Sequence, residues 1–83
     1  MTVQFHSHAR ARLQERGATE AEVRETVEQG ERFSAKFGRT GFRRNFSYQG
    51  LWRGRHYANK QVEAIAIQEG EDWLVITVMV RFF

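Results

Sequence analysis

Three side chains near the start of the chain have the types and the spacing of a site that handles phosphate. His8, Arg12 and Arg16 recur every four residues, so a helix would place them in one stripe. His8 would lie in the first turn, where the helix dipole disfavours the imidazolium form. A neutral imidazole can accept the proton of a ribose 2′-hydroxyl while arginines bind the adjacent phosphate. The alternative for His8 is a capping or surface histidine.

Two residues further along are candidates for the second proton-transfer group. His56 or Lys60 would donate a proton to the leaving oxygen, and Arg43 would act with Arg16 as a phosphate clamp. The alternative for His56 is a histidine on the surface of a strand.

The middle of the chain, residues 32–60, holds eight Lys and Arg residues and no Asp or Glu. Its formal charge is +8, against −2 for residues 1–31 and −3 for residues 61–83. Aromatic residues are interleaved with these cations, namely Phe33, Phe37, Phe42, Phe46, Tyr48, Trp52 and Tyr57. Guanidinium groups pair with phosphates and aromatic faces stack on unpaired bases, so the segment predicts an anionic partner, RNA above others. We expect these arginines to gather on one accessible surface.

The alternative for the basic segment is that its aromatic side chains form core on one strand face and its cations are solvated on the other. Under the RNA interpretation, further cationic, aromatic and polar residues are expected to contact the ligand. They are Arg12, Arg39, Arg44, Tyr48, Trp52, Arg53, Arg55, Tyr57, Thr77 and Arg81. Thr77 is one polar residue in an apolar strand, and its alternative is a hydroxyl that is satisfied locally.

No pattern in the sequence indicates a metal or cofactor site, and we expect no cofactor. Cysteine is absent, which excludes disulfides and thiolate ligands. His6 and His8 are two positions apart, so a helix would not place them on one face, and His6 is expected to be structural. There is no phosphate-binding glycine loop and no nucleophile elbow.

The length of 83 residues suffices for one domain, expected to span residues 1–83. Residues 1–16 are polar and charged, unlike a signal peptide. The most apolar run, residues 73–80, is shorter than the roughly 20 residues that a membrane helix needs. Together with the absence of cysteine, this predicts a cytoplasmic protein that does not associate with membranes.

The first third of the chain predicts a short strand at residues 2–5 and two helices. The first helix would run over residues 8–16, with Ser7 as its N-cap and Gly17 as its stop. The second would begin at a capping box formed by Thr19 and Glu22, and would end at Gly30.

The rest of the chain has the period of two that is typical of strands. A first strand face would carry Phe33, Ala35 and Phe37, followed by a hairpin turn at residues 38–41. Further strands are expected at residues 42–49, 51–58, 62–68 and 73–82, with Gly50 as a break between the first two.

A four-residue turn at residues 69–72 would place Gln68 opposite Trp73 and sort the last two strands into faces. One face is expected to pack on the helices: Ile65, Ile67, Leu74, Ile76, Val78 and Val80. The smaller and more polar face is expected to floor a groove: Val62, Ala64, Ala66, Trp73, Val75, Thr77, Met79 and Arg81.

Several blocks then occur together along the whole chain. They are Ser7-His8-Ala9, Arg12, Arg16-Gly17, Gly30, residues 36–46, residues 60–63 and residues 76–78. This combination resembles the bacterial family described as domain of unknown function 4258, which is placed with RelE-like toxins in the barnase–EndoU–colicin–RelE group of small metal-independent ribonucleases. Motif positions in this resemblance are His8, Arg16, Arg43, Lys60 and Thr77.

The resemblance implies an α+β fold, with two N-terminal helices on one face of a mostly antiparallel four- to five-stranded sheet, and RNA as the substrate class. RelE-type toxins often use an aromatic or basic residue near the C-terminus, and Arg81 is the candidate here. The first hypothesis is therefore a metal-independent endoribonuclease or mRNA interferase, with an acidic antitoxin that covers residues 32–60. The second is a non-catalytic RNA- or ribosome-binding module. The third is a protein-interaction or self-association domain that uses Phe82, Phe83 and a strand edge.

Overall fold

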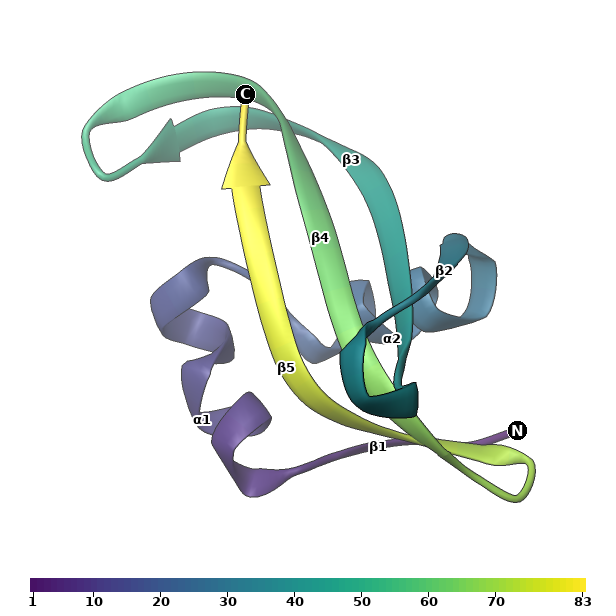
Figure 1. The fold of residues 1–83 in the computed structure, drawn as a ribbon. Helices are drawn as coiled ribbons and strands as arrows, with labels where there is room; N and C mark the ends of the chain where they lie inside the picture. Colours follow the sequence, from purple (N-terminus) through teal and green to yellow (C-terminus); the bar gives the residue numbers. More distant parts are fainter.

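The computed structural model describes residues 1–83 as two helices on one face of a five-stranded sheet (Figure 1). The elements in chain order are β1 (Val3–Phe5), α1 (Ser7–Arg16), α2 (Glu20–Gln29), β2 (Glu31–Ser34), the 3-10 helix η1 (Lys36–Gly38), β3 (Thr40–Trp52), β4 (Arg55–Glu69) and β5 (Asp72–Phe82). The spatial order of the sheet is β1-β5-β4-β3-β2, and only β1 and β5 are parallel. The predicted α+β fold is confirmed.

Helix α1 begins one residue before the predicted start and is capped by a histidine. The backbone N–H of His6 donates to Val75 O at 2.8 Å, so the chain is held to β5 up to this residue. The ring of His6 then caps the helix, because its Nδ1 accepts the N–H of His8 at 3.1 Å. Ser7, the predicted cap, is the first helical residue, and Gly17 ends the helix at φ 84°, as expected.

Helix α2 has the predicted capping box. The Thr19 hydroxyl accepts the N–H of Glu22 at 3.1 Å, and a Glu22 carboxylate oxygen accepts the N–H of Thr19 at 3.0 Å. Val23 and Val27 are buried in the core, so the local signals for this helix agree with its packing.

The predicted turn at residues 38–41 is wrong. Ser34 pairs with Thr40, and the N–H of Ala35 donates to the carbonyl of Arg39, so the turn spans residues 35–39 and contains η1. Phe33 lies in β2, whereas Phe37 has a left-handed backbone and is 86% exposed, so the two rings do not share a strand face. The turn lies earlier than predicted because Phe37 and Gly38, at its centre, both have positive φ.

The predicted break at Gly50 is also wrong, because β3 and β4 form one long hairpin. β3 continues through Gly50 to Trp52, and a bulge between Ser47 and Gly50 absorbs the irregularity, with Gln49 at φ 50°. The hairpin turns at Arg53 and Gly54, both at positive φ, where Trp52 pairs with Arg55. Residues 51–58 and 62–68 are therefore not two strands, since β4 runs unbroken from residue 55 to residue 69.

The predicted faces are wrong for β4 and for the first part of β5, but right for Val78 and Val80, which lie on the core side. Gln68 does pair with Trp73, but five residues expected to floor a groove are buried in the core instead: Val62, Ala64, Ala66, Trp73 and Val75. Ile67, which was expected in the core, is 38% exposed. Ile65 pairs with Thr77 and Ala66 with Val75, so Ile76 is an extra residue that moves Val78 to the helix side. The helices cover the alanine-rich face because small side chains permit close approach.

Candidate functional site

The edge of β5 is largely unpaired. β5 has 11 residues, and β1 pairs with only three of them, residues 73–75. Helix α1 packs against β5 and lies beside the middle of the strand, past the pairing with β1 (Figure 1). Arg16 Nη1 donates to Val78 O on the edge at 2.6 Å, which ties the end of α1 to β5. The space between α1 and the edge is therefore lined by side chains of both elements.

Three adjoining hollows run along this edge, and together we call them the β5 edge groove. The first is lined by His6, His8, Arg39, Ile67, Leu74, Ile76 and Thr77. The second has a volume of about 310 Å³ and is lined by His8, Ala9, Arg12, Arg16, Ile76, Thr77 and Val78. The third is lined by Glu15, Arg16, Trp52, Arg53, Met79 and Val80. Shared lining residues join the hollows, namely His8, Ile76 and Thr77 between the first two and Arg16 between the last two.

The groove carries an excess of positive charge, with four arginines and one glutamate among its lining residues. Its four arginines, Arg12, Arg16, Arg39 and Arg53, form no ion pair. Glu15 is the one acidic residue that lines it. The arginines come from α1 and from the two hairpin turns, so the fold assembles this charge from three separate parts of the chain.

The stripe predicted on the first helix lies in the groove. His8, Arg12 and Arg16 line the second hollow together, and Thr77 lies on its β5 side. The ring centroids of His6 and His8 are 5.7 Å apart. Because His6 Nδ1 accepts the N–H of His8, only Nε2 of His6 remains for a ligand. The second hollow thus combines two arginines with the exposed imidazole of His8.

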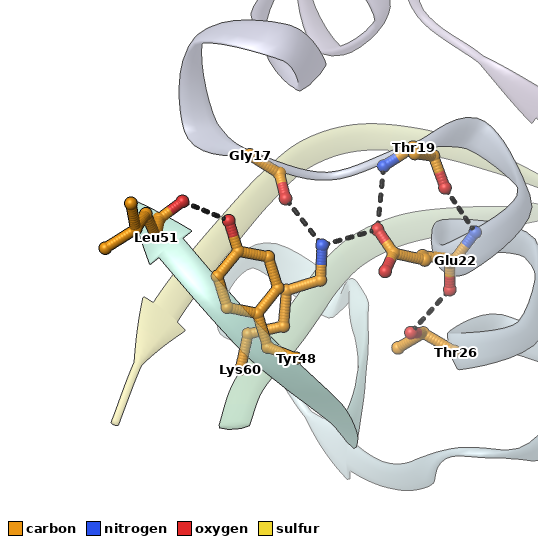
Figure 2. A network of polar contacts seen from close by, with 7 residues as sticks. All are labelled: Gly17, Thr19, Glu22, Thr26, Tyr48, Leu51 and Lys60. Carbon is orange, nitrogen blue, oxygen red and sulfur yellow. Dashed lines mark hydrogen bonds and ion pairs between the residues drawn. The ribbon is translucent and has the colours of Figure 1, made fainter. Parts of the chain in front are cut away.

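Lys60 lies elsewhere, in a buried polar network that links β4 to the junction of α1 and α2 (Figure 2). The residue is 5% exposed, and its Nζ donates to Gly17 O at 2.7 Å and to Glu22 Oε1 at 2.8 Å. Its ammonium group also lies 5.4 Å from the centroid of the Tyr48 ring. The structure gives Lys60 these partners and does not bring it into the β5 edge groove.

Arg43 and Arg44 are held by glutamates from other parts of the chain. Arg43 lies opposite Glu31 of β2 and Glu63 of β4, and forms ion pairs with them at 3.1 and 3.2 Å. Arg44, on the other face of β3, pairs with Glu25 of α2 at 2.8 Å. The expectation that the mid-chain arginines gather on one accessible surface is wrong, because strand alternation separates them and folding brings carboxylates to them.

Three of the aromatic residues expected to contact RNA surround Phe82 at the end of β5. The rings of Tyr48, Trp52 and Tyr57 lie 5.0, 4.8 and 5.7 Å from the Phe82 ring, between centroids. Tyr48 Oη also donates to Leu51 O at 2.6 Å. These contacts pack the curled end of the β3–β4 hairpin against the end of β5 (Figure 1), and Trp52 in addition lines the third hollow.

The remaining predicted contacts are scattered. His56 is exposed and pairs with Leu51 near the hairpin turn. Arg55 lies in the same hairpin, with its guanidinium 5.8 Å from the Tyr57 ring centroid. Arg81 is exposed and lies 5.3 Å from the ring centroid of Phe83. None of these three residues lines the β5 edge groove.

The sequence interpretation missed the role of Phe82 and the burial of Lys60. A signal for the second was available, because Ala66, Ala64 and Val62 alternate along β4 and the next position of that face is Lys60. A lysine that continues a core face is expected to be buried with an acidic partner. No sequence signal marks Phe82, whose contacts depend on the curvature of the hairpin.

A known family matches nearly the whole chain. The model of the family described as Domain of unknown function (DUF4258) matches residues 5–80. The chain belongs to the DUF4258 family. The matched region of this DUF4258 domain contains α1, the Lys60 network and the β5 edge groove as far as Val80. No curated protein and no solved structure matches the chain.

The DUF4258 domain lacks both a metal-binding cluster and a membrane-spanning helix. No group of three or more His, Asp or Glu side chains is arranged to hold a metal ion. Neither of its helices has the length and apolar character needed to cross a membrane.

Proposed function

We propose that this DUF4258 domain binds RNA in the β5 edge groove. The observation that carries the proposal is the set of four arginines without acidic partners, Arg12, Arg16, Arg39 and Arg53, along one continuous groove. Unneutralised cations in a row repel one another unless an anion lies between them. A chain of phosphates supplies one charge per nucleotide along such a row, which a single small anion does not.

The choice of RNA rests on what else lines the groove. Thr77 and His8 place a hydroxyl and an imidazole beside the arginines, and both can hydrogen-bond a ribose 2′-hydroxyl. The arrangement of two helices on a mostly antiparallel sheet is also what the resemblance to RelE-like ribonucleases implies. These features support RNA over DNA, whose sugar lacks that hydroxyl.

A second proposal, for catalysis, is favoured by the position of His8 in the same hollow as Arg12 and Arg16. His8 would remove the proton of a 2′-hydroxyl, and the 2′-oxygen would attack the adjacent phosphorus. The bond from phosphorus to the 5′-oxygen would break, giving a 2′,3′-cyclic phosphate and a 5′-hydroxyl. Since His56 and Lys60 do not line the groove, the 5′-oxygen would take its proton from water.

The proposal also changes what an acidic antitoxin-like partner would cover. Three cations of residues 32–60, Arg43, Arg44 and Lys60, already have carboxylate partners. An acidic protein would therefore gain most by covering the β5 edge groove, where it would exclude RNA.

RNA binding is tested by fluorescence anisotropy with a labelled single-stranded RNA of roughly 12 nucleotides, a length within the range of single-strand site sizes. The double variant Arg12→Gln/Arg39→Gln is expected to weaken binding by about 10-fold or more, because each lost phosphate contact weakens binding. The matched control is Arg43→Gln/Arg44→Gln, which also removes two charges but from sites with acidic partners. Equal losses in both variants, or no binding by the parent chain, would refute the groove as the RNA site.

Catalysis is tested by incubating the same RNA with the parent chain and with His8→Ala in the presence of a chelator. The expected products carry 2′,3′-cyclic phosphate ends and are absent for His8→Ala, whose RNA affinity should fall by no more than about 10-fold, the effect of one lost hydrogen bond. Binding without cleavage by the parent would reject the catalytic proposal and leave the binding proposal standing.

A further inference from the structure

Phe37 is the most exposed large apolar residue of the protein, and its backbone is strained. It is 86% exposed, and it has φ 62° and ψ 34°, the left-handed conformation. That conformation costs an aromatic residue on the order of 1–2 kcal/mol relative to glycine, and residues such as glycine or asparagine adopt it more easily. The turn that contains η1 therefore holds a ring in water at a position where neither packing nor turn geometry calls for one.

Cations flank the ring and connect it to the groove. Lys36 precedes Phe37, and the Arg39 guanidinium lies 5.6 Å from the centroid of its ring. Arg39 also lines the first hollow of the β5 edge groove together with His8 and Thr77. Neither Lys36 nor Arg39 forms an ion pair. The ring thus lies beside one end of the groove, next to two unneutralised cations.

We propose that Phe37 is a stacking residue for one unpaired base of the RNA, with Lys36 and Arg39 bound to the phosphates on either side of that nucleotide. The inference rests on the proposed function and narrows its substrate to RNA with a single-stranded nucleotide next to the bound phosphates. An exposed aromatic face stacks on any base, and the adjacent cations supply the phosphate contacts that orient it. A paired base has both faces covered in the duplex and cannot occupy this position.

The expected change in RNA affinity on replacement of Phe37 follows from the free energy of stacking of one base on an aromatic side chain. Phe37→Ala should weaken binding of the roughly 12-nucleotide single-stranded RNA by on the order of 10-fold, and Phe37→Trp should restore it. Binding of a duplex of the same sequence should change by less than about twofold. The control is Leu51→Ala, which removes another apolar side chain, 68% exposed, from the other end of the β3–β4 hairpin.

A set of RNAs with one abasic nucleotide moved along the strand tests the base itself. One abasic position should weaken binding to the parent chain about as much as Phe37→Ala does, and should have no further effect on Phe37→Ala, because both changes remove the same contact. A fluorescent base analogue at that position should be quenched by the parent chain and not by Phe37→Ala.

The variant Phe37→Gly separates stacking from folding. Glycine relieves the strain at φ 62°, so the melting temperature should stay unchanged or rise while RNA affinity falls as it does for Phe37→Ala. If Arg12→Gln/Arg39→Gln weakens binding but Phe37→Ala and every abasic RNA bind like the parent pair, the stacking inference is refuted and the proposed function stands. If the parent chain binds no RNA, both are refuted.

Discussion

Two sets of cations in this protein have opposite surroundings. Lys60, Arg43 and Arg44 each form an ion pair with a glutamate, whereas the arginines of the β5 edge groove form no ion pair. Both sets draw on residues 32–60, the stretch without a single carboxylate in the sequence. The absence of Asp and Glu from residues 32–60 therefore does not predict that their cations lack acidic partners. Strand pairing and helix packing bring glutamates of α2, β2 and β4 to Arg43, Arg44 and Lys60.

The contrast separates cations whose charge is neutralised within the fold from cations whose charge is not. The buried Lys60 ammonium has two hydrogen-bond partners, which compensate its removal from water. The groove arginines lie where water or a ligand can reach them, so their mutual repulsion persists until an anion binds.

Replacement of Lys60 by methionine should lower the free energy of unfolding by about 4 kcal/mol, because it leaves the Glu22 carboxylate partly buried without its cation. Urea denaturation measures this change. The double variant Lys60→Met/Glu22→Gln should recover part of the loss, since no unpaired charge remains. A change below about 1 kcal/mol, the range of surface ion pairs, would contradict a structural role for Lys60.

Replacement of Gly17 by alanine should lower the free energy of unfolding by about 3 kcal/mol, from left-handed strain and overpacking together. A Cβ there would lie 2.8 Å from Phe82 Cζ and 2.9 Å from the Trp52 ring, at φ 84°. Gly70→Ala is the matched control, because it has φ 65° and nothing within 4 Å of its Cβ. Its cost should be about 1 kcal/mol, from strain alone. Equal costs at both positions would show that the contact with Phe82 and Trp52 is loose.

Replacement of Arg12 by glutamine should reduce the salt dependence of RNA binding. The slope of log affinity against log salt should fall in magnitude by about 0.7, the value for one phosphate contact on a single strand. Arg44→Gln should leave the slope unchanged, because Glu25 already neutralises that guanidinium. Titrations at several salt concentrations give both slopes, and a larger change for Arg44→Gln would reverse the assignment of the two sets.

Replacement of Arg10 by glutamine should have the smallest effect. Arg10 pairs with Glu20 at 2.9 Å, but its side chain is 55% exposed and Arg24 contacts the same carboxylate. The free energy of unfolding should change by less than about 0.5 kcal/mol, as for other exposed ion pairs. RNA affinity should also be unchanged, because this residue does not line the groove. A larger loss in urea denaturation would mean that exposed and buried ion pairs contribute alike here.

Local signals in the sequence predicted the elements best. The Thr19 capping box and the Gly17 stop depend on residues a few positions apart, and both are present. The pairing of Gln68 with Trp73 followed from a short turn and is also present. The predicted break at Gly50 was wrong. Glycine has a low propensity for strands, but the pairing of β3 with the long strand β4 tolerates it at this position.

The part of the candidate site that could be predicted is the part formed by residues close together in the sequence. The stripe formed by His8, Arg12 and Arg16 follows from helical spacing, and the structure places all three residues in one hollow. The partners of Arg43 and Arg44 could not be predicted, because they are set by pairing between strands and by packing of α2.

The extra residue in β5 has a consequence for how the length of this strand can vary. Ile76 exchanges the sides on which the following residues point, so Val78 is in the core while Met79 faces solvent. Loss of Thr77 would move Val78 and Val80 to the solvent side and direct Met79 and Arg81 toward the core. Homologous sequences that fold in this way should therefore accommodate insertions and deletions in the hairpin loops and keep the residue count of β5 constant.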